Sequence, residues 1–328
     1  MTDRPRTALL GSLIGVTVVS WSLNFIVGKI GLRHMPALTL ATLRVTLAAF
    51  VIVAVYLFAA MRRRGAAQAP PHDRRFHFDR RDALTFLRLG FLGVVVNQVC
   101  FTVGLSYTTV GHAALIIGMG PIFVLLLARL QGLEALTLKK VMGMAAAFAG
   151  VAVLAAEHGV SLHSNTLRGD LITFTGSVAF SLYTVLGKKV AEQYDSLAMN
   201  TFNYLVGAAL LAPLTILECR RLAHGPGWAS PGWTGWGAVA FMAVFSSVIA
   251  YLIYFWALRY MTASRLATFS YIQPVATTLL GIAWLGDHFT RSLLLGGALI
   301  LAGVYSIESG PRERPGQEIL SSDSISNS

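Results

Sequence analysis

Polar and aromatic side chains recur at helical spacing inside the most apolar stretches of this sequence, where such residues can hold a small organic molecule. Asn, Gln and Arg are costly in an apolar surrounding, and they usually mark a ligand pathway or a hydrogen bond between helices. Aromatic rings can stack on a ligand or enclose it. The candidate binding residues are Trp21, Asn24, Phe25, Arg44, Asn97, Gln98, Tyr183, Asn203, Tyr251, Tyr254, Tyr271 and Gln273.

Arg44 is the most informative of these residues because it stands well inside an apolar run. Its guanidinium could hold a substrate carboxylate through two parallel hydrogen bonds. Alternatively, the long side chain could extend along its helix and place the charge at the membrane surface. Each Asn and Gln also has a plainer interpretation, as a hydrogen bond that joins two helices.

Two prolines, Pro121 and Pro274, lie inside apolar runs that otherwise suit helices. A proline within a helix lacks an N–H and leaves the carbonyl four residues earlier without its usual partner. Such a carbonyl is costly in hydrocarbon unless protein, water or a ligand satisfies it. We therefore expect Gly118, Pro121 and Pro274 to act as hinges beside a polar cavity. The alternative is an ordinary packing kink in which a neighbouring Ser or Thr supplies the hydrogen bond.

Residue types for covalent or metal chemistry are sparse, so we predict neither an enzyme nor a metal or cofactor site. The two cysteines, Cys100 and Cys219, fall in or beside apolar runs and do not suggest a disulfide framework. The sequence has no G-x-x-x-x-G-K-[ST] loop, which argues against direct drive by ATP. Glu134 and Asp287 are expected to cap the N-termini of the helices that follow them rather than to carry protons.

Membrane-spanning helices must position these side chains, because the 328-residue chain is 55% hydrophobic and only 12% charged. Its mean hydropathy is +0.64. Soluble domains carry about 25% charged residues, and about 20 apolar residues cross a bilayer as one helix. The sequence predicts an all-α membrane protein with ten transmembrane helices, at residues 8–31, 36–60, 84–107, 111–131, 138–157, 168–191, 196–218, 233–259, 264–285 and 291–309.

Basic residues lie mostly between the apolar runs, and the net charge is +11. If the N-terminus is cytoplasmic, Lys and Arg are more frequent on the cytoplasmic side, as the positive-inside rule requires. The pattern predicts a multi-pass protein of a bacterial inner (plasma) membrane, with residues 1–7 and a disordered tail at residues 310–328 both cytoplasmic. It argues against a nucleic-acid partner and suggests that the basic loop at residues 62–81 contacts anionic lipid headgroups.

The second half of the chain resembles the first when the halves are aligned at offsets of 159 and then 153 residues. Pro121 then falls on Pro274, and matched Gly, Tyr, Thr and acidic positions follow the same frame. The alignment predicts two five-helix units, at residues 8–157 and 168–309. Because five is odd, the second unit enters the membrane from the opposite side. Such inverted-topology repeats are typical of alternating-access transporters.

A family resemblance is carried by a few short stretches. WSLNF begins at Trp21 in the first helix, and GLSYTTVGHAALI precedes Pro121 in the third and fourth. An acid near the end of the fourth helix, Glu134, is followed by AGV at residues 149–151. Over residues 8–309 the sequence resembles the EamA branch of the drug/metabolite transporter (DMT) superfamily. The resemblance implies a ten-helix inner-membrane carrier, often an exporter of amino acids or related metabolites.

We therefore expect a secondary, alternating-access transporter of small organic metabolites, and export of an amino acid or related metabolite is the first hypothesis. A multidrug efflux carrier and a flippase for lipid-linked substrates are the alternatives on the same fold, and a channel is a further one. A membrane enzyme would need paired His, Asp or Glu at one membrane face, which the short loops lack. The expected partners are a small-molecule substrate and membrane lipids, and the sequence does not specify an oligomeric state.

Overall fold

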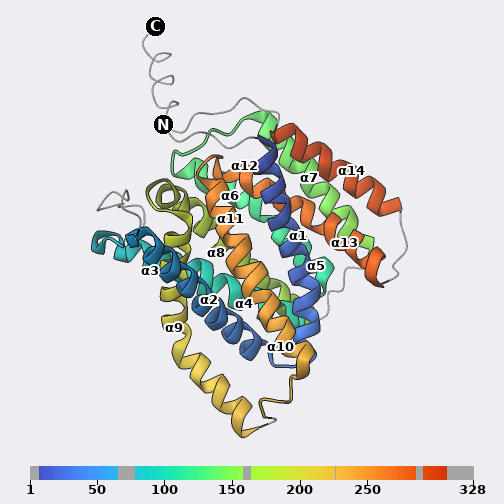
Figure 1. The fold of residues 1–328 in the computed structure, drawn as a ribbon. Helices are drawn as coiled ribbons and strands as arrows, with labels where there is room; N and C mark the ends of the chain where they lie inside the picture. The colour runs from blue at the N-terminus through green and yellow to red at the C-terminus, as the bar shows by residue number, and fades with distance from the viewer. Residues whose placement is uncertain (1–6, 66–77, 158–163, 226, 286–290, 309–328) are drawn as a thin grey trace.

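All the regular elements are helices in the part of the chain that the computed structural model describes (Figure 1). That part comprises residues 7–65, 78–157, 164–225, 227–285 and 291–308. A helix satisfies its own backbone hydrogen bonds, so it is the form that long apolar runs adopt in hydrocarbon. Six of the described helices are long and apolar enough to cross a membrane, and Ile116–Leu130 and Leu294–Ile307 are shorter apolar helices. The all-helical membrane architecture is confirmed, and the count of ten spans stays a prediction.

The N-terminal half contains two long helices, a third rod made of consecutive segments, and a broken fourth rod. In the third rod a 3-10 turn, an α-helix, a π-helix and a second α-helix follow one another without a gap. The elements are α1 (Thr7–Leu32), α2 (Ala37–Gly65), η1 (Arg80–Asp82), α3 (Ala83–Leu89), η2 (Gly90–Val96), α4 (Asn97–Tyr107), α5 (Val110–Gly118), α6 (Gly120–Leu130) and α7 (Leu138–Glu157).

The C-terminal half contains the same order of long, composite and broken rods. A π-helix again lies within its third rod, and a 3-10 turn divides its fourth. The elements are α8 (Ser164–Gln193), α9 (Ser196–His224), α10 (Gly232–Phe241), η3 (Met242–Ile249), α11 (Ala250–Leu258), α12 (Ala263–Thr268), η4 (Phe269–Tyr271), α13 (Ile272–Leu285) and α14 (Arg291–Glu308).

The two π-helices, η2 and η3, fall at corresponding places in the two halves. Under the offset of 153, η2 aligns with residues 243–249, which lie inside η3. A π-helical turn is wider than an α-helical turn and is frequent at functional sites. Asn97 directly follows η2, and Ser246 and Ser247 lie within η3. The widened turns thus adjoin polar side chains in both halves, while the inverted two-fold relation between the halves stays a prediction.

Both prolines lie in the first turn of a helix that follows a break. Pro121 is at the start of α6, after α5 has ended at Gly118. Pro274 is in the first turn of α13, directly after the 3-10 turn η4. Each proline thus lies beside an interruption of its rod, and the hinge role of Gly118, Pro121 and Pro274 stays a prediction. Proline is tolerated in a first turn because the N–H that it lacks has no partner within the helix there.

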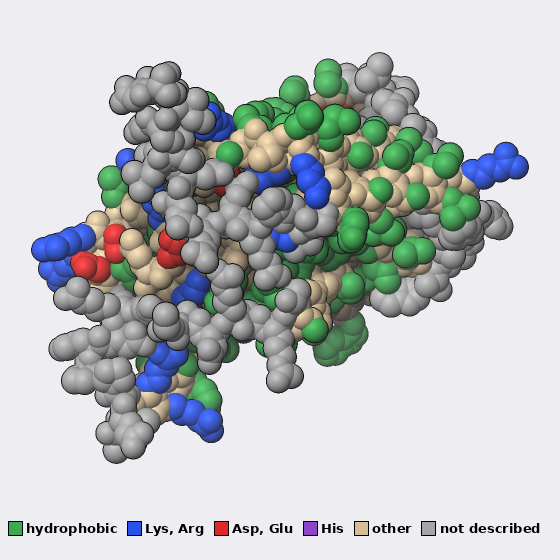
Figure 2. Space-filling model, turned by 90° about the horizontal axis from the view of Figure 1, so that it is seen from above, with side chains coloured by type: hydrophobic (Ala, Val, Ile, Leu, Met, Phe, Trp, Pro, Cys, Tyr) green, Lys and Arg blue, Asp and Glu red, His purple; other side chains and the backbone are tan. Residues whose placement is uncertain are grey.

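Hydrophobic side chains cover much of the molecular surface, as expected for a protein that faces lipid. Figure 2 shows many of them in the upper and right-hand part of the view, and the visible Lys and Arg side chains gather mainly on the left, together with acidic ones. Large exposed hydrophobic side chains include Phe50 on α2, Leu130 at the end of α6 and Trp233 on α10. Patches of this kind would favour association in water and are stable in hydrocarbon.

Several regions of the sequence prediction fall wholly or largely outside the described residues. They are the N-terminal segment at residues 1–7, the basic loop at residues 62–81, Asp287 and the tail at residues 310–328. Contact between the basic loop and anionic lipid headgroups therefore remains a proposal. The boundaries of the two five-helix units likewise stay predictions.

α7 and α14 pack side by side at one edge of the molecule (Figure 1). A Cβ atom placed on Gly150 of α7 would lie 2.5 Å from the carbonyl oxygen of Gly296 and 2.9 Å from the backbone nitrogen of Ile300. Both atoms belong to the α14 backbone. Small residues allow helices in a membrane to approach this closely, and the gain is van der Waals contact between the backbones.

Replacing Gly150 with Val should destabilise the protein, because the α14 backbone must move away to admit the side chain. Overpacking of this kind costs about 1–3 kcal/mol. We expect a lower midpoint of thermal unfolding for the purified protein in detergent. Gly15→Val is the matched control, since no atom lies within 4 Å of an ideal Cβ at Gly15. Equal midpoints for the two variants would contradict the close contact.

Candidate functional site

A cavity with an empty volume of about 780 Å³, part of it open to solvent, lies among the helices of both halves. Its wall includes side chains from α1, α2, α4, α6, α8, α11 and α13. Small-molecule sites usually occupy about 300–1,000 Å³. The structure brings nine of the predicted site residues to this cavity: Trp21, Asn24, Phe25, Arg44, Asn97, Gln98, Pro121, Tyr251 and Gln273.

Six predicted residues lie outside the lining of this cavity. Tyr183 and Asn203 are completely buried, and the Asn203 amide donates to the Tyr183 hydroxyl at 3.0 Å. Tyr254 lines a smaller neighbouring pocket, which shares Trp21 and Gln273 with the cavity. The geometry therefore gives no support for direct ligand contact by these six: Tyr183, Asn203, Tyr254, Tyr271, Gly118 and Pro274.

The candidate list missed a stripe of small and polar residues on α8. Thr173, Ser177 and Phe180 line the cavity at positions i, i+4 and i+7. This spacing places all three on one helix face, and it could have been found from the sequence. Phe180 is also the counterpart of Trp21 under the 159-residue offset. The other lining residues outside the candidate list are Phe101, Ile117, Gly120, Val124, Gly176, Ser246, Ala267 and Ser270.

Arg44 is buried at the cavity wall, with only 3% of its surface exposed. Its two terminal nitrogens donate to the Thr102 hydroxyl at 3.4 Å and to the Ser247 hydroxyl at 3.2 Å. Its Nε has no hydrogen-bond partner. In the described part of the chain no carboxylate pairs with Arg44. The side chain therefore does not extend to the membrane surface, and its charge stays inside the protein uncompensated.

A closed set of hydrogen bonds holds the side chains beneath Arg44. The Ser247 hydroxyl donates to Gln98 Oε1 at 3.1 Å, and Gln98 Nε2 donates to the Tyr204 hydroxyl at 2.6 Å. The Tyr204 hydroxyl in turn donates to the Ser247 carbonyl at 3.0 Å. Because every member of this set is neutral, the set positions the guanidinium without neutralising it. A satisfied polar network of this kind is rigid.

Asn97 and Tyr251 make a second satisfied pair in the cavity wall. The Tyr251 hydroxyl donates to Asn97 Oδ1 at 3.0 Å, and Asn97 Nδ2 donates to the Gly176 carbonyl at 3.1 Å. This pair joins α4, α8 and α11. The amide of Asn24 differs, because its Oδ1 is buried with no hydrogen-bond donor. Asn24 therefore has a buried acceptor without a donor at the wall of the cavity.

Aromatic rings form the apolar part of the wall. The ring centroid of Trp21 lies 5.6 Å from that of Phe180 and 5.7 Å from that of Tyr251. The Trp21 indole also donates to the Ser246 carbonyl at 3.1 Å, which fixes its orientation. Phe25 and Phe101 form an edge-to-face pair with centroids 5.3 Å apart. Pairs of this geometry are favourable beyond their burial.

The corresponding positions in the two halves differ in a way that makes the cavity one-sided. Under the 159-residue offset, Asn24 and Arg44 correspond to Tyr183 and Asn203. The first pair faces the cavity, whereas the second pair is hydrogen-bonded to itself and buried. The Tyr183 ring fits because Gly93 has no side chain: a Cβ there would lie 2.5 Å from the ring. Space for a ligand therefore lies on the side of Asn24 and Arg44.

Two serines contact the backbone of the other half beside the interruption of its fourth rod, and each hydroxyl also donates to a carbonyl of its own helix, at 2.8 and 2.9 Å. The Ser22 hydroxyl lies 3.3 Å from the carbonyl oxygen of Gln273, the residue before Pro274. The Ser181 hydroxyl lies 3.3 Å from the carbonyl oxygen of Gly120, the residue before Pro121. Ser22 and Ser181 correspond under the 159-residue offset. In each half a serine of the first helix thus contacts the broken fourth rod of the other half.

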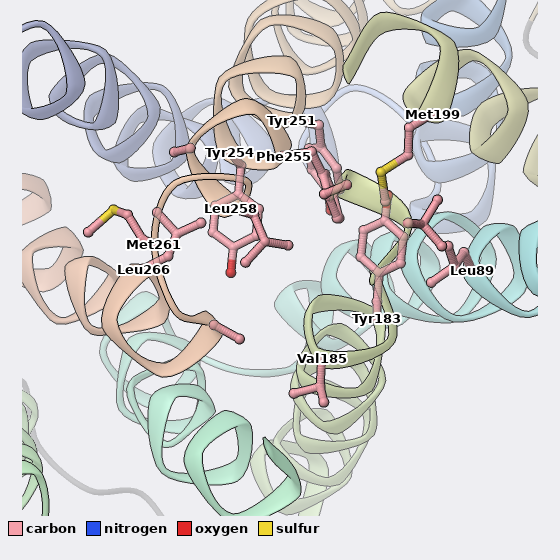
Figure 3. Packing of buried hydrophobic residues seen from close by; sticks show 14 of the residues in the cluster. Leu89, Tyr183, Val185, Met199, Tyr251, Tyr254, Phe255, Leu258, Met261 and Leu266 are labelled. Atoms are coloured by element: carbon pink, nitrogen blue, oxygen red, sulfur yellow. The ribbon is translucent and has the colours of Figure 1, made fainter. Parts of the chain in front are cut away.

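A cluster of aromatic and aliphatic side chains (Figure 3) packs against one end of the cavity, and Tyr251 belongs to both. In that view Tyr183 lies beside Leu89 and Met199, which come from α3 and α9. The ring centroids of Tyr183 and Phe255 are 4.8 Å apart. The cluster also contains Ile14, from the first half of α1. It therefore lies at the end of the bundle where α1 begins and where α8 ends.

Polar contacts fasten the two halves together at this closed end. Glu134 Oε1 accepts from the Ser264 backbone N–H at 3.0 Å, and its other oxygen accepts from the Ser264 hydroxyl. Glu134 thus caps α12 in the other half. The sequence predicts instead that Glu134 caps the helix that follows it, and this prediction is wrong. The Tyr194 hydroxyl donates to Asp82 at 2.7 Å. Burial, and then this bond to Asp82, raise the pKa of Tyr194 to about 12, so its phenol remains a donor near neutral pH.

Comparison with known proteins gives a family match in both halves of the chain. The model of a family described as the EamA-like transporter family matches residues 9–156 and again residues 167–308. YyaM of Bacillus subtilis, described as an uncharacterized transporter, is 32% identical over 69% of this chain and 73% of its own. YedA of Escherichia coli K12, described as an uncharacterized inner membrane transporter, is 25% identical over 98% of this chain and 97% of its own.

Other comparisons extend the likeness to an archaeal protein and to a solved structure. An uncharacterized transporter of Archaeoglobus fulgidus is 25% identical over 90% of this chain and 97% of its own. A protein of known crystal structure superposes with a TM-score of 0.70 at 20% identity, over 92% of this chain and 96% of that chain. This last likeness concerns the fold alone.

Replacing Tyr183 with Phe should destabilise the protein, because it leaves the buried Asn203 amide without its acceptor. Orphaning a buried donor costs about 1–3 kcal/mol. We expect a lower midpoint of thermal unfolding, and Tyr107→Phe, at an exposed tyrosine, should leave the midpoint unchanged. Adding Asn203→Leu should restore much of the loss, since removing both partners is nearly neutral. A double variant no more stable than Tyr183→Phe alone would contradict the assigned pair.

Proposed function

This chain belongs to the EamA-like transporter family, and on that premise we propose that it exports small organic metabolites across a bacterial inner membrane by alternating access. Membership makes the chain a multi-pass membrane transporter. An amino acid or a related metabolite is the substrate class that we propose for it. The transport is secondary, since the chain contains no G-x-x-x-x-G-K-[ST] loop for ATP.

The observation that carries this proposal is a cavity enclosed by both halves and closed at one end by packed side chains. Alternating access requires a binding space that opens to one side of the membrane at a time. The closing cluster joins residues of α1 and α3 to residues of α8, α9, α11 and α12. Because both halves contribute, a relative movement of the halves opens this end.

The positive-inside rule indicates on which side of the membrane the closed end of the cavity lies. We place the start of α1 in the cytoplasm, because the basic residues favour that orientation. The closed end, where α1 begins, is then cytoplasmic, and the cavity opens toward the periplasm. The protein is thus in an outward-facing state. For the inward-facing state the contacts of Glu134 with Ser264 and of Tyr194 with Asp82 must break.

The pair of serine-to-carbonyl contacts supplies the pivots in this mechanism. Ser22 and Ser181 make equivalent contacts in the two halves. In an inverted repeat the two halves exchange conformations between the outward and inward states. A contact made equally in both halves can therefore persist during the exchange. Pro121 and Pro274 lie in the first turns of the two helices that these serines contact.

The cavity's polar groups favour a metabolite with a carboxylate over the alternative of a cationic drug. Arg44 is the charged residue among the described lining residues, and none of those residues is Asp or Glu. A cation placed beside a buried guanidinium is repelled in a medium of low dielectric constant. The aromatic wall around Trp21 can hold the apolar body of an organic molecule.

Transport can be tested by counterflow in proteoliposomes that contain the purified protein. We expect accumulation of a radiolabelled substrate when the vesicles are preloaded with that substrate, in a screen of amino acids and other carboxylate-bearing metabolites. Trp21→Ala should reduce the rate about tenfold or more, because it removes an aromatic wall of the site. Trp233→Ala removes an exposed indole that is 95% accessible and should leave the rate unchanged.

Absence of counterflow for every carboxylate-bearing compound, with correctly folded protein, would overturn the proposed substrate class. Counterflow that is equal for Trp21→Ala and Trp233→Ala would remove the cavity from the transport pathway. Counterflow of cationic drugs alone would favour the multidrug alternative, and transfer of a fluorescent lipid-linked substrate between leaflets would favour the flippase.

The proposed orientation predicts which face reaches the cavity. In a Cys100→Ser, Cys219→Ser background, Ile117→Cys at the cavity should react with a membrane-impermeant thiol reagent added from the periplasmic side. Val185→Cys, inside the closing cluster, should react from neither side. Labelling of Ile117→Cys from the cytoplasmic side only, measured by mass shift in oriented vesicles, would reverse the assignment.

A further inference from the structure

We propose that the cavity selects substrates that carry a net negative charge, namely a carboxylate on an apolar or aromatic body with no ammonium group. This inference rests on the proposed transport function and narrows its substrate class to the related carboxylate metabolites, in place of the free amino acids. It divides metabolites that share a carboxylate into monoanions, which bind, and zwitterions, which bind much less well. Four observations support it, and they concern the charge, the geometry, the wall and the second half of the molecule.

The charge of the cavity is positive and unbalanced. Arg44 cannot lose its proton at any physiological pH, and none of the described lining residues is acidic. A buried charge with no partner is strongly unfavourable. A ligand with one net negative charge removes that cost when it binds. A zwitterion brings an ammonium group into the same space and leaves the site with its net positive charge.

The geometry of Arg44 leaves it ready for a carboxylate. Thr102 and Ser247 each accept one hydrogen bond from the terminal nitrogens, at 3.4 and 3.2 Å. The Nε donor has no partner. A guanidinium has five N–H donors and binds a carboxylate best through two parallel bonds. The donors that remain, with Nε among them, are sufficient for such a pair.

The rest of the wall suits an apolar body and one neutral donor. Trp21, Phe25 and Tyr251 present ring faces or edges to the cavity. Asn24 lines the cavity and its Oδ1 is a buried acceptor with no donor, so rotation of this amide would let it accept from a hydroxyl or amide N–H of the ligand. It is neutral and does not offset the repulsion between Arg44 and an ammonium group. The structure therefore fits a hydroxy acid or an N-acylated acid better than a free amino acid.

The second half of the molecule shows that the fold does not need a charge at this position. Asn203 corresponds to Arg44 in the offset alignment, and there a neutral amide bonded to Tyr183 fills the same place. Both positions are buried on the second helix of their half. Because a neutral pair suffices for packing, the charge of Arg44 serves the ligand.

Binding to the full-length protein in detergent tests this proposal with four probes that share one phenylalkyl body. At neutral pH 3-phenylpropanoate is an anion, phenylalanine is a zwitterion, 3-phenylpropanamide is neutral, and phenethylamine is a cation. We expect 3-phenylpropanoate to bind with a Kd about tenfold or more below that of phenylalanine, and the amide and the amine to bind less well still. Calorimetric titration measures all four without any need for transport.

Equal or tighter binding of phenylalanine would overturn the proposal, and so would binding of phenethylamine as tight as that of 3-phenylpropanoate. Because binding is measured apart from transport, the two proposals fail separately. Anion binding without counterflow would overturn the transport function and leave this inference standing. Counterflow of free amino acids in preference to the matched anions would leave the transport function standing and overturn this inference.

A substitution at Arg44 gives a second and independent test. Arg44→Gln should weaken 3-phenylpropanoate binding about 10- to 100-fold and abolish the preference for the anion over phenylalanine. The midpoint of thermal unfolding without ligand should stay the same or rise, because an unpaired buried charge has been removed. Arg33→Gln, at an exposed arginine, removes the same charge elsewhere and should change neither property.

Arg44→Lys keeps the charge and loses the planar two-bond geometry, so it should retain the anion preference with weaker binding. This variant keeps the test decisive if Arg44→Gln does not fold. Unchanged anion binding in either folded variant would overturn the role of Arg44, as would a preference for the anion that survives in Arg44→Gln.

Discussion

A helix that is interrupted inside a membrane needs polar partners from the protein, and two such interruptions organise the centre of the molecule. Each half interrupts its fourth rod, before Pro121 and before Pro274, and beside each break a serine from the first helix of the other half lies 3.3 Å from a carbonyl oxygen in the first turn of the helix that follows. Water is scarce at this depth, so the donor has to come from protein. The requirement ties the two halves together at the same places where their helices are broken, and the cavity lies between those places.

Within the cavity, pairing among polar groups determines what is left for a ligand. Gln98 and Asn97 lie in the wall, but both are occupied by bonds to neighbouring side chains or backbone. They stiffen the site and offer little to a substrate. Arg44 and Asn24 keep an unpaired donor and acceptor. The chemistry available to a substrate thus comes from the few groups that the fold does not satisfy, whereas most of the polar residues serve the architecture.

Much of this site was within reach of sequence reasoning, because helical spacing and the internal alignment predict which side chains share a face. Trp21, Asn24 and Gln98, which this reasoning selects, line the cavity, and the stripe of Thr173, Ser177 and Phe180 could have been selected in the same way; their contact with a substrate stays a prediction. The burial of Arg44 was not predictable, since a residue near a helix end can equally extend to the surface. The burial of Tyr183 away from the cavity was not predictable either, because the ring occupies space that Gly93, on a helix distant in the sequence, leaves open.

The sequence by itself determined that this protein is helical and lies in a membrane, because apolar runs of this length can satisfy their backbone in lipid only as helices. It also indicated which positions correspond between the two halves. Only the tertiary structure decided which of two corresponding polar pairs faces an open space and which one closes on itself. It also decided that the prolines begin helices rather than bend them. Those outcomes depend on how neighbouring helices are rotated and how closely they approach, and contacts between residues far apart in the chain set both.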